Sequence, residues 1–188
     1  VFDMPLFVAV AMAIIAGGIA GLLNGVFGSY FRLPVFIVTL GMLEVGRGVT
    51  YMLTNSQTVY IGPSVQEFSL PIMGIGISPA FLISLGLVVI FQIVLSRTVF
   101  GRYLVAIGTN EQAAKISGIR TEPYLTSALL ISGLLAGLGG FLNTAYIGAS
   151  DPNAALGLEL SAIAAAVIGG TSLMGGRGSI VGAFIGVL

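Results

Sequence analysis

Three long stretches without a charged side chain constrain this chain more than any other feature of its sequence. Residues 4–31, 68–96 and 123–150 hold 28, 29 and 28 consecutive uncharged residues. A helix needs about 20 apolar residues to cross the roughly 30 Å hydrocarbon core of a bilayer. Helices in the cores of soluble proteins seldom run this long without a charge. After the turn signals at their ends are trimmed, the predicted spans are 5–28, 79–96 and 124–147.

The composition supports lipid as the solvent of this chain. Charged residues make up 7% of the sequence, hydrophobic residues make up 56%, and the mean hydropathy is +1.08. A soluble domain carries about 25% charged residues, so this chain has too little polar surface to cover a globule in water. The predicted fold class is therefore all-α, as a polytopic transmembrane helix bundle.

The residue types that are missing exclude several functions. The sequence contains no cysteine and no histidine, so it lacks thiolate chemistry, the usual general base and the commonest metal ligand. No metal site and no cofactor are expected, and the chain is not expected to be an enzyme. Seven acids balance seven bases, and no nucleic-acid partner is expected.

A fourth apolar segment, 34–53, contains two opposite charges, Glu44 and Arg47. Residues three apart lie on one face of a helix, so these side chains can pair. A charge within the bilayer costs on the order of a few kcal/mol unless it is paired or hydrated. We therefore expect an intramembrane pair that faces the bundle interior. A structural role is favoured over a position on a transport pathway.

The segment between Glu159 and Arg177 is marginal as a membrane span. It holds 17 uncharged residues, 160–176, and four of them are glycines. This pattern indicates a short or broken helix, which membranes tolerate only where protein or water surrounds the backbone. A further helix is predicted over 179–188. Because both ends lie close to apolar runs, residues 1–188 are expected to form a single transmembrane domain that is truncated at both ends.

Glycines recur at a spacing of four in three places, which puts small residues along one stripe of a helix. Helices in lipid gain little from hydrophobicity, so their association depends on close backbone packing. The spacing therefore predicts tight helix or subunit contacts. The glycines concerned are Gly17, Gly21 and Gly25, then Gly133 and Gly137, and then Gly178, Gly182 and Gly186.

The distribution of basic residues predicts the orientation of the chain. The loop 97–122 contains four of the seven basic residues, whereas 54–78 and 148–159 contain none. Loops rich in lysine and arginine stay in the cytoplasm. The loop 97–122 is therefore predicted to be cytoplasmic, and the other two loops, together with Asp3, are predicted to lie outside.

The cytoplasmic loop encodes a short helix. Thr109 stands three residues before Gln112, which is the spacing of a capping box at a helix start. Gly118 is placed to end the helix in a left-handed conformation, and Ile119 can then pack back on the last turn. We predict a helix over about 110–117. So short a helix is marginal alone in water, and it fits either a lever moved by a cytosolic motor or an ordinary solvated connection.

The stretch GRYLVAIGTNEQAAKISGI, residues 101–119, closely resembles the cytoplasmic coupling loop of the permease subunits of ribose-type sugar ABC importers. The resemblance continues through LPVFIVTLGMLEVGRG (33–48) and DPNAALGLELSAIAAAVIGGTSLMGGRGSIVGAFIG (151–186). It covers most of the chain in the same order, and it includes polar residues as well as apolar ones. Lys115 stands where an arginine is frequent in the family, so a bidentate contact at that position is not expected.

The resemblance implies a multi-pass subunit of the bacterial cytoplasmic membrane that imports a monosaccharide such as ribose. Two permease copies would form the path, cytosolic ATP-binding subunits would dock on the coupling loops and hydrolyse ATP, and an exported sugar-binding protein would deliver the sugar. By resemblance, the coupling role falls on Gly101, Arg102, Ala106, Ile107, Gly108, Asn110, Glu111, Ala113, Ala114, Gly118 and Ile119.

The sequence gives little indication of where a sugar passes. The glycine-rich stretch Gly169–Ser179 lacks the Lys-Ser or Lys-Thr pair of a phosphate-binding loop, so it is interpreted as a break between helices. The candidate pathway residues are Asn24, Thr39, Asn143 and Thr144. Lone polar residues in membrane helices more often serve helix packing.

Two other classes of transporter are alternatives: a secondary transporter or channel without an ATPase, and an amino-acid permease of the same superfamily. A secondary transporter usually carries a coupling acid in a span, and Glu44, the one clear candidate, is expected to be neutralised by Arg47. The stretch AIGTNEQAAKISGI looks like the corresponding sequence in the sugar branch of the superfamily.

The outer loop 54–78 is expected either to dock the binding protein or to be an ordinary connection. Its composition fits both interpretations equally. The residues that would contribute to docking are Asn55, Gln57, Tyr60, Pro63, Gln66 and Glu67.

Overall fold

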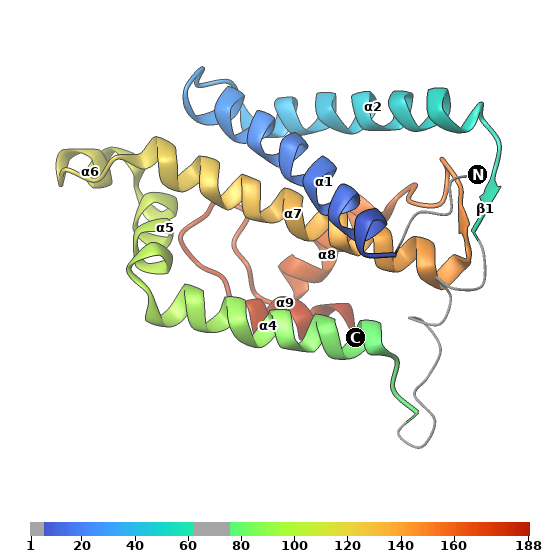
Figure 1. Ribbon diagram of the computed structural model, residues 1–188. Coiled ribbons are helices and arrows are strands. Elements are labelled where there is room, and N and C mark those ends of the chain that lie inside the picture. The colour runs from blue at the N-terminus through green and yellow to red at the C-terminus, as the bar shows by residue number, and fades with distance from the viewer. Residues whose placement is uncertain (1–5, 62–75) are drawn as a thin grey trace. The chain divides into compact units, whose positions relative to one another are not determined.

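The computed structural model describes residues 6–61 and 76–188, which fold almost entirely into helices (Figure 1). This confirms the predicted all-α transmembrane fold class. Four residues of the predicted outer face lie outside the described residues: Asp3, Pro63, Gln66 and Glu67. The helices that are long and apolar enough to cross a membrane are α1 (Leu6–Ser29), α2 (Val35–Thr54), α4 (Pro79–Arg97) and α7 (Thr121–Ile147).

The start of α7 differs from the sequence prediction. This helix begins at Thr121 rather than at 124, and Pro123 lies within its first turn. The first amides of a helix have no partner within the helix, so a proline there removes no hydrogen bond. Pro123 therefore does not delay the start of α7.

The long helices expose the apolar side chains that a soluble protein would bury. No residue of α2 or of α4 is buried in the described chain. Phe36 is 68% exposed and Met52 is 82% exposed. Contiguous apolar surface of this kind is normally covered by lipid or by another protein.

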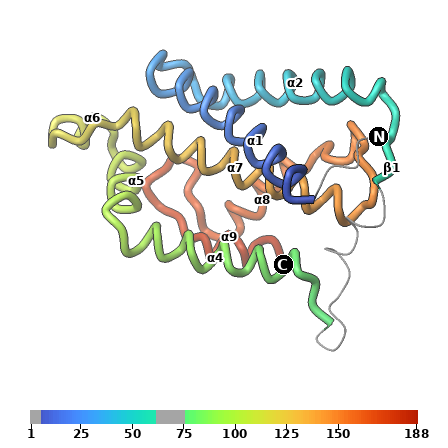
Figure 2. Tube along the Cα trace, in the orientation of Figure 1, coloured from blue at the N-terminus to red at the C-terminus, as the bar shows by residue number. Residues whose placement is uncertain are grey.

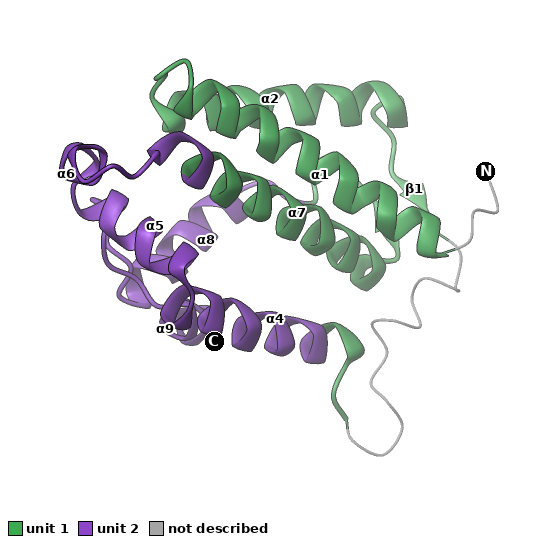
Figure 3. Cartoon of the chain, turned by 60° about the vertical axis from the view of Figure 1, so that its left-hand side comes forward, with its two compact units in different colours: residues 1–80, 125–154 green, residues 81–124, 155–188 purple. Residues whose placement is uncertain are grey.

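The described residues divide into two compact units (Figure 3). Unit 1 contains the chain up to Ala80 together with Leu125–Ala154. Unit 2 contains Phe81–Tyr124 and Ala155–Leu188. The predicted cytoplasmic loop therefore belongs to unit 2, together with the glycine-rich stretch near the C-terminus.

In unit 1, α1 and α7 pack along the two glycine stripes that the sequence predicts (Figure 2). A Cβ added to Gly21 would lie 2.9 Å from the Cα of Gly133, and one added to Gly17 would lie 2.8 Å from the Cα of Gly137. The Thr126 hydroxyl also donates a hydrogen bond to a carbonyl of α1, at 3.3 Å. The prediction of close helix packing is confirmed for these stripes.

The far end of α2 is tied to the segment that follows α7. The strand β1 (Val59–Tyr60) pairs antiparallel with β2 (Ala149–Ser150). The Tyr51 hydroxyl of α2 donates a 2.6 Å hydrogen bond to the side-chain oxygen of Asn153. Asn55 caps α2 in the left-handed conformation, with φ of 50°. These contacts fix the described part of the predicted outer loop within unit 1.

Unit 2 holds several shorter helices. The predicted short or broken helix at 160–176 is an 11-residue helix that ends at Ile168. The Gly182 and Gly186 stripe packs against its end, where a Cβ on Gly186 would lie 3.0 Å from the amide of Gly169. Gly178 precedes the next helix, so it is not part of the stripe. These helices are α5 (Val99–Thr109), α6 (Glu111–Ile116), α8 (Leu158–Ile168) and α9 (Ile180–Val187).

A glutamine of α4 caps the start of α9. The Gln92 side-chain oxygen accepts hydrogen bonds from the amides of Ile180, at 3.0 Å, and Val181, at 3.3 Å. Ser179 accepts from the amide of Gly182 at 3.2 Å. The first amides of a helix lack partners within it, so Gln92 joins α4 to α9 by satisfying two of them.

We expect Gln92→Leu to lower the free energy of unfolding of the protein by about 1–3 kcal/mol, since two amides would lose their partner. Thermal unfolding in detergent, followed by circular dichroism, measures this loss. Ser96→Ala is the matched control, because the Ser96 hydroxyl bonds to the backbone of α4 itself. Equal unfolding temperatures for the two variants would contradict the capping role.

Candidate coupling site

The loop that carries the predicted coupling residues contains two helices rather than one. The Thr98 hydroxyl accepts a 3.2 Å hydrogen bond from the amide of Gly101 and starts α5, which the sequence analysis missed. The sequence does contain a signal for α5, because Phe100, Tyr103 and Ile107 follow Thr98 at helical spacing. The prediction of a polar loop with a single short helix is therefore wrong for residues 99–109.

The predicted capping box at Thr109 is also wrong. The α5 helix continues through Thr109, whose hydroxyl donates to the carbonyl of Val105 at 2.8 Å. The first non-helical residue is Asn110, and its side-chain oxygen accepts from the amide of Ala113 at 3.0 Å. Asparagine is among the strongest N-cap residues. The unforeseen helix therefore moves the cap one residue along the chain.

The predicted end of α6 is confirmed. Gly118 is left-handed, with φ of 84°. Its amide donates to the carbonyl of Lys115 at 3.0 Å, and the amide of Ile119 donates to that of Ala114 at 3.1 Å. This pair of hydrogen bonds defines a Schellman motif. The helix covers 111–116 rather than 110–117, and it is capped at both ends.

Side chains of α6 hold it against the first turn of α7. Glu111 accepts a 3.0 Å hydrogen bond from the hydroxyl of Thr121, which is 0% exposed. Glu111 also pairs with Lys115 at 2.7 Å, and Lys115 lies 3.6 Å from Glu122. The half-exposed ion pairs contribute at most about 1 kcal/mol each. Leaving the buried Thr121 hydroxyl unpaired would cost about 1–3 kcal/mol, so this hydrogen bond matters most.

Aromatic rings hold α5 against the same turn. The Tyr124 ring lies 5.2 Å from that of Tyr103, in an edge-to-face arrangement at 88°. Its centroid lies 5.9 Å from that of Phe100. Such pairs contribute about 0.5–1.5 kcal/mol beyond the area that they bury. Residues 98–124 therefore form one connected structure, which we call the coupling module.

The predicted coupling residues separate into buried and exposed groups. Gly101, Ile107 and Ala114 are buried, which indicates that they serve packing. A Cβ added to Gly101 would meet the backbone of Leu95, at the end of α4 and outside the module. Ile116, which was not predicted, is 88% exposed and lies one turn from the exposed Ala113. Gly108 and Ile119 are half-buried, and the exposed members of the predicted set are Arg102, Ala106, Asn110, Glu111, Ala113 and Gly118.

The predicted intramembrane ion pair forms, at 2.9 Å between Arg47 and Glu44. The Glu44 side chain is 67% exposed in the described chain, and the prediction that the pair faces the interior of a larger bundle stays a prediction. The α2 helix buries none of its residues, so its charged face is open. Whether the pair is structural or lines a pathway stays a prediction.

The four candidate pathway residues lie on three helices of unit 1. The side-chain oxygen of Asn24 in α1 is buried and has no hydrogen-bond partner among the described residues. Thr39 of α2 donates to the carbonyl of Phe36 at 3.0 Å, a bond within its own helix. Asn143 and Thr144 of α7 are half-buried. Their contribution to a sugar path stays a prediction.

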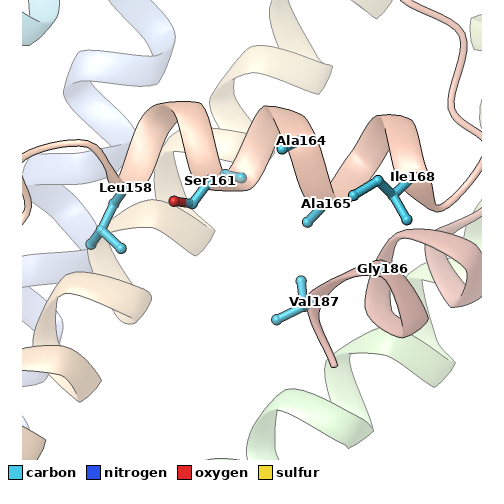
Figure 4. A pocket seen from close by; sticks show the side chains of 8 residues that line it. Leu158, Ser161, Ala164, Ala165, Ile168, Gly186 and Val187 are labelled. Atoms are coloured by element: carbon cyan, nitrogen blue, oxygen red, sulfur yellow. The ribbon is translucent and has the colours of Figure 1, made fainter.

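An open groove of about 560 Å³ lies between α8 and α9 in unit 2 (Figure 4). Its wall is apolar apart from one side-chain hydroxyl. Polar ligands are oriented by several placed hydrogen-bonding groups, so this groove is poorly suited to holding a sugar. The lining residues are Leu158, Ser161, Ala162, Ala164, Ala165, Ile168, Gly186 and Val187.

Four described helices that are long and apolar enough to cross a membrane define a polytopic membrane protein, and comparison with known proteins identifies its family. The family described as branched-chain amino acid transport system / permease component matches residues 1–188. The chain therefore belongs to this permease family, which confirms the resemblance found in the sequence. No solved structure matches the chain significantly.

Curated relatives cover almost all of this chain. It is 36% identical over 98% of its length to a D-allose transport system permease protein of Escherichia coli. It is 33% identical over 99% of its length to a ribose import permease protein of Haemophilus influenzae, and 36% identical over 98% to an autoinducer 2 import system permease protein of Salmonella choleraesuis. The chain spans 53–59% of the length of these relatives.

Proposed function

We propose that this chain is the membrane-spanning part of an ATP-driven importer that moves a monosaccharide such as ribose into the bacterial cytoplasm. Membership of the permease family and the functions for which two relatives are named, D-allose transport and ribose import, support this. The proposed partners are a cytosolic ATP-binding subunit, an exported sugar-binding protein and a second permease copy. The coupling module lies in the cytoplasm.

The observation that carries the proposal is the construction of α6. A six-residue helix is too short to be stable alone in water, yet this one has an Asn110 cap, a Schellman end and a buried hydrogen bond to Thr121. An ordinary connecting loop needs none of these. They hold Ala113 and Ile116 in a fixed position on an exposed face, as docking to a soluble partner requires.

Ile116 is the residue on which we expect docking to depend most. An 88% exposed isoleucine in an aqueous loop gains free energy when a partner removes it from water, and full burial of such a side chain is worth about 1.5–3 kcal/mol. Short helices commonly bind to grooves through apolar side chains of this kind. We propose that Ile116 binds to a groove of this kind on the ATP-binding subunit.

We expect Ile116→Asp in the full-length permease to reduce co-purification of the ATP-binding subunit by about tenfold or more, because a carboxylate would replace the apolar anchor. Ile116→Leu is the control and is expected to retain the complex. Both proteins are co-expressed, and the ratio of subunits in the detergent-purified complex is measured. A normal ratio for Ile116→Asp, at normal membrane abundance, would exclude α6 as the docking helix.

The substrate class is tested separately. The family description names branched-chain amino acids, which keeps amino-acid import as the second candidate. Proteoliposomes that contain the complete importer are expected to take up ribose or allose in an ATP-dependent manner and to leave leucine outside. ATP-dependent uptake of leucine alone would favour the amino-acid alternative.

A transporter without an ATPase is distinguished by its energy source. Such a protein would take up solute under an ion gradient in the absence of ATP. Glu44 is the one acid within the four described long helices that lies far from both helix ends, and Arg47 neutralises it at 2.9 Å. We therefore expect no gradient-driven uptake by the permease alone.

The outer side of unit 1 is the proposed docking surface for the exported binding protein. Tyr60 of β1 is 82% exposed, and Asn55 and Gln57 are exposed beside it. The pairing of β1 with β2 fixes the backbone that carries them. Exposed tyrosine is favoured at protein interfaces because it combines a large apolar ring with a polar hydroxyl.

A further inference from the structure

The glycine-rich stretch that follows α8 forms a closed turn. The amide of Ser172 donates to the carbonyl of Arg177 at 2.9 Å, so the two arms of the turn are joined at its base. Gly175 and Gly176 both have positive φ, 87° and 74°. We call residues 172–177 the glycine turn. The stretch separates α8 from α9, as the sequence predicts, and it also makes a specific contact within unit 2.

The glycine turn touches the end of α5 backbone to backbone. A Cβ added to Gly108 would lie 2.6 Å from the amide nitrogen of Gly176, and one added to Gly175 would lie 2.7 Å from the carbonyl oxygen of Gly108. A Cβ on Gly176 would lie 2.5 Å from the side-chain oxygen of Thr109 and 2.8 Å from its Cα. The three glycines therefore leave no room for a side chain between the two segments.

The contact lies at the point where α6 is attached. Gly108 and Thr109 are the last residues of α5, and Asn110 directly after them is the N-cap of α6. A displacement of α6 that travels back along the chain towards α5 therefore reaches the residues that touch the glycine turn.

The other side of the glycine turn is connected to α8 and α9. The turn follows α8 by three residues, and Ser179, the N-cap of α9, lies two residues after its end. The ends of α8 and α9 are themselves in close contact, since a Cβ on Gly182 would lie 3.3 Å from the carbonyl carbon of Gly169. The glycine turn, α8 and α9 are thus linked by short, direct connections.

We propose that the contact of Gly108 and Thr109 with Gly175 and Gly176 transmits displacement of α6 to α8 and α9. The inference rests on the proposed function, in which a cytosolic ATPase moves α6, and it names the residues that carry this movement onward. The glycine turn is thus, together with α6, an element of the importer that transmits movement.

The scarcity of side chains at this contact is the physical reason for transmission. The one side chain there, that of Thr109, is held by a 2.8 Å hydrogen bond from its hydroxyl to the carbonyl of Val105. Closely packed protein is hardly compressible, and a contact between two backbones contains no rotamers that can absorb a shift. A packing contact that served stability alone would be met equally well by interlocking side chains. Position along a path does not by itself demonstrate coupling, so the two roles are separated by experiment.

Gly108→Ala tests the contact in the full-length permease assembled with its ATP-binding subunit and binding protein. Gly108 lies outside the positive-φ region, so alanine there adds only the obstructing methyl group. In the assembled complex we expect about a tenfold lower amount of sugar imported per ATP hydrolysed, a ratio that does not depend on how much of the ATP-binding subunit is bound. Gly86→Ala in α4 is the control, because a Cβ there meets no atom within 4 Å, and its import is expected to be unchanged.

A second measurement does not depend on the folding of Gly108→Ala. The 188 residues contain no cysteine, so spin labels can be placed on Gln112→Cys in α6 and on Leu173→Cys in the glycine turn. Both positions are exposed. We expect ATP to change the spectrum of both labels in the assembled importer.

The outcomes separate this proposal from the proposed function. A response at Gln112→Cys without one at Leu173→Cys would overturn transmission through the glycine turn while leaving the coupling helix intact. Unchanged import per ATP in a well-assembled Gly108→Ala complex would do the same. If neither label responds and no ATP-binding subunit is bound, the proposed function itself fails, and the transmission proposal fails with it.

Discussion

Gly133→Ala is expected to lower the free energy of unfolding of the permease by about 1–3 kcal/mol, the usual cost of overpacking a tight contact. A Cβ at this position would lie 2.7 Å from the Cα of Gly21 and 2.9 Å from its amide nitrogen. Both obstructing atoms belong to backbone, so α1 and α7 would have to move apart along their whole contact. Thermal unfolding in detergent and the amount of folded protein in membranes measure this effect.

Gly139→Ala is the matched control for this experiment. Gly139 lies in the same helix, and a Cβ there meets no atom within 4 Å. Alanine in a helix interior is favoured over glycine by about 0.5–1 kcal/mol, so Gly139→Ala should leave the unfolding temperature unchanged or raise it. The two substitutions therefore differ in the sign of their effect. If Gly133→Ala also raised the unfolding temperature, the close packing of α1 on α7 would be disproved.

Gly118→Val is expected to reduce the stimulation of ATP hydrolysis by the loaded binding protein by about tenfold. Gly118 has φ of 84°, and the left-handed conformation costs other residues about 1–2 kcal/mol. A Cβ at this position meets no atom within 4 Å, so the penalty is confined to the backbone. About 1.4 kcal/mol corresponds to a factor of ten in an equilibrium. Because a helix as short as α6 is marginally stable on its own, its folded population would fall by up to this factor.

Gly118→Asn provides the control, because asparagine tolerates the left-handed conformation. It is expected to retain most of the stimulation. Limited trypsin digestion at Lys115 gives an independent readout, since cleavage should be faster in Gly118→Val than in the parent or in Gly118→Asn. Equal cleavage and equal stimulation in the two variants would show that the Schellman end of α6 is not needed for coupling.

The sequence predicted those features that depend on residues close together in the chain. Apolar stretches placed α1, α2 and α4 within one or two residues of their observed ends. A single glycine predicted the left-handed end of α6, because only glycine adopts that conformation without strain. Glycines at a spacing of four predicted the surfaces through which α1 and α7 pack.

Sequence signals for helix ends gave a wrong prediction where two of them fell on the same residues. Thr109 is a plausible N-cap in isolation, but α5 extends through it and leaves Asn110 as the cap. The capping box could be rejected only by recognising α5, whose start at Thr98 was overlooked because basic residues on both sides suggested a loop. The error in one helix thus caused the error in the next.

Contacts between distant segments could not be read from the sequence at all. Gln92 and Ile180 are 88 residues apart, and nothing near either residue indicates the other. The same is true of the close approach of Gly108 to Gly176. Thr121 looked like one more residue of a polar loop, although its hydroxyl is fully buried against Glu111.

The early end of α8 has an electrical consequence for the membrane. Eleven residues at 1.5 Å per residue make a helix about 16 Å long, which is about half of the roughly 30 Å hydrocarbon layer. Within this layer the irregular backbone that follows is tolerated only where protein or water surrounds it, and water beside it would replace part of the hydrocarbon. The membrane potential would then fall across a much thinner insulating slab beside α8 than elsewhere, and a hydrated solute would face a shorter stretch of low dielectric constant.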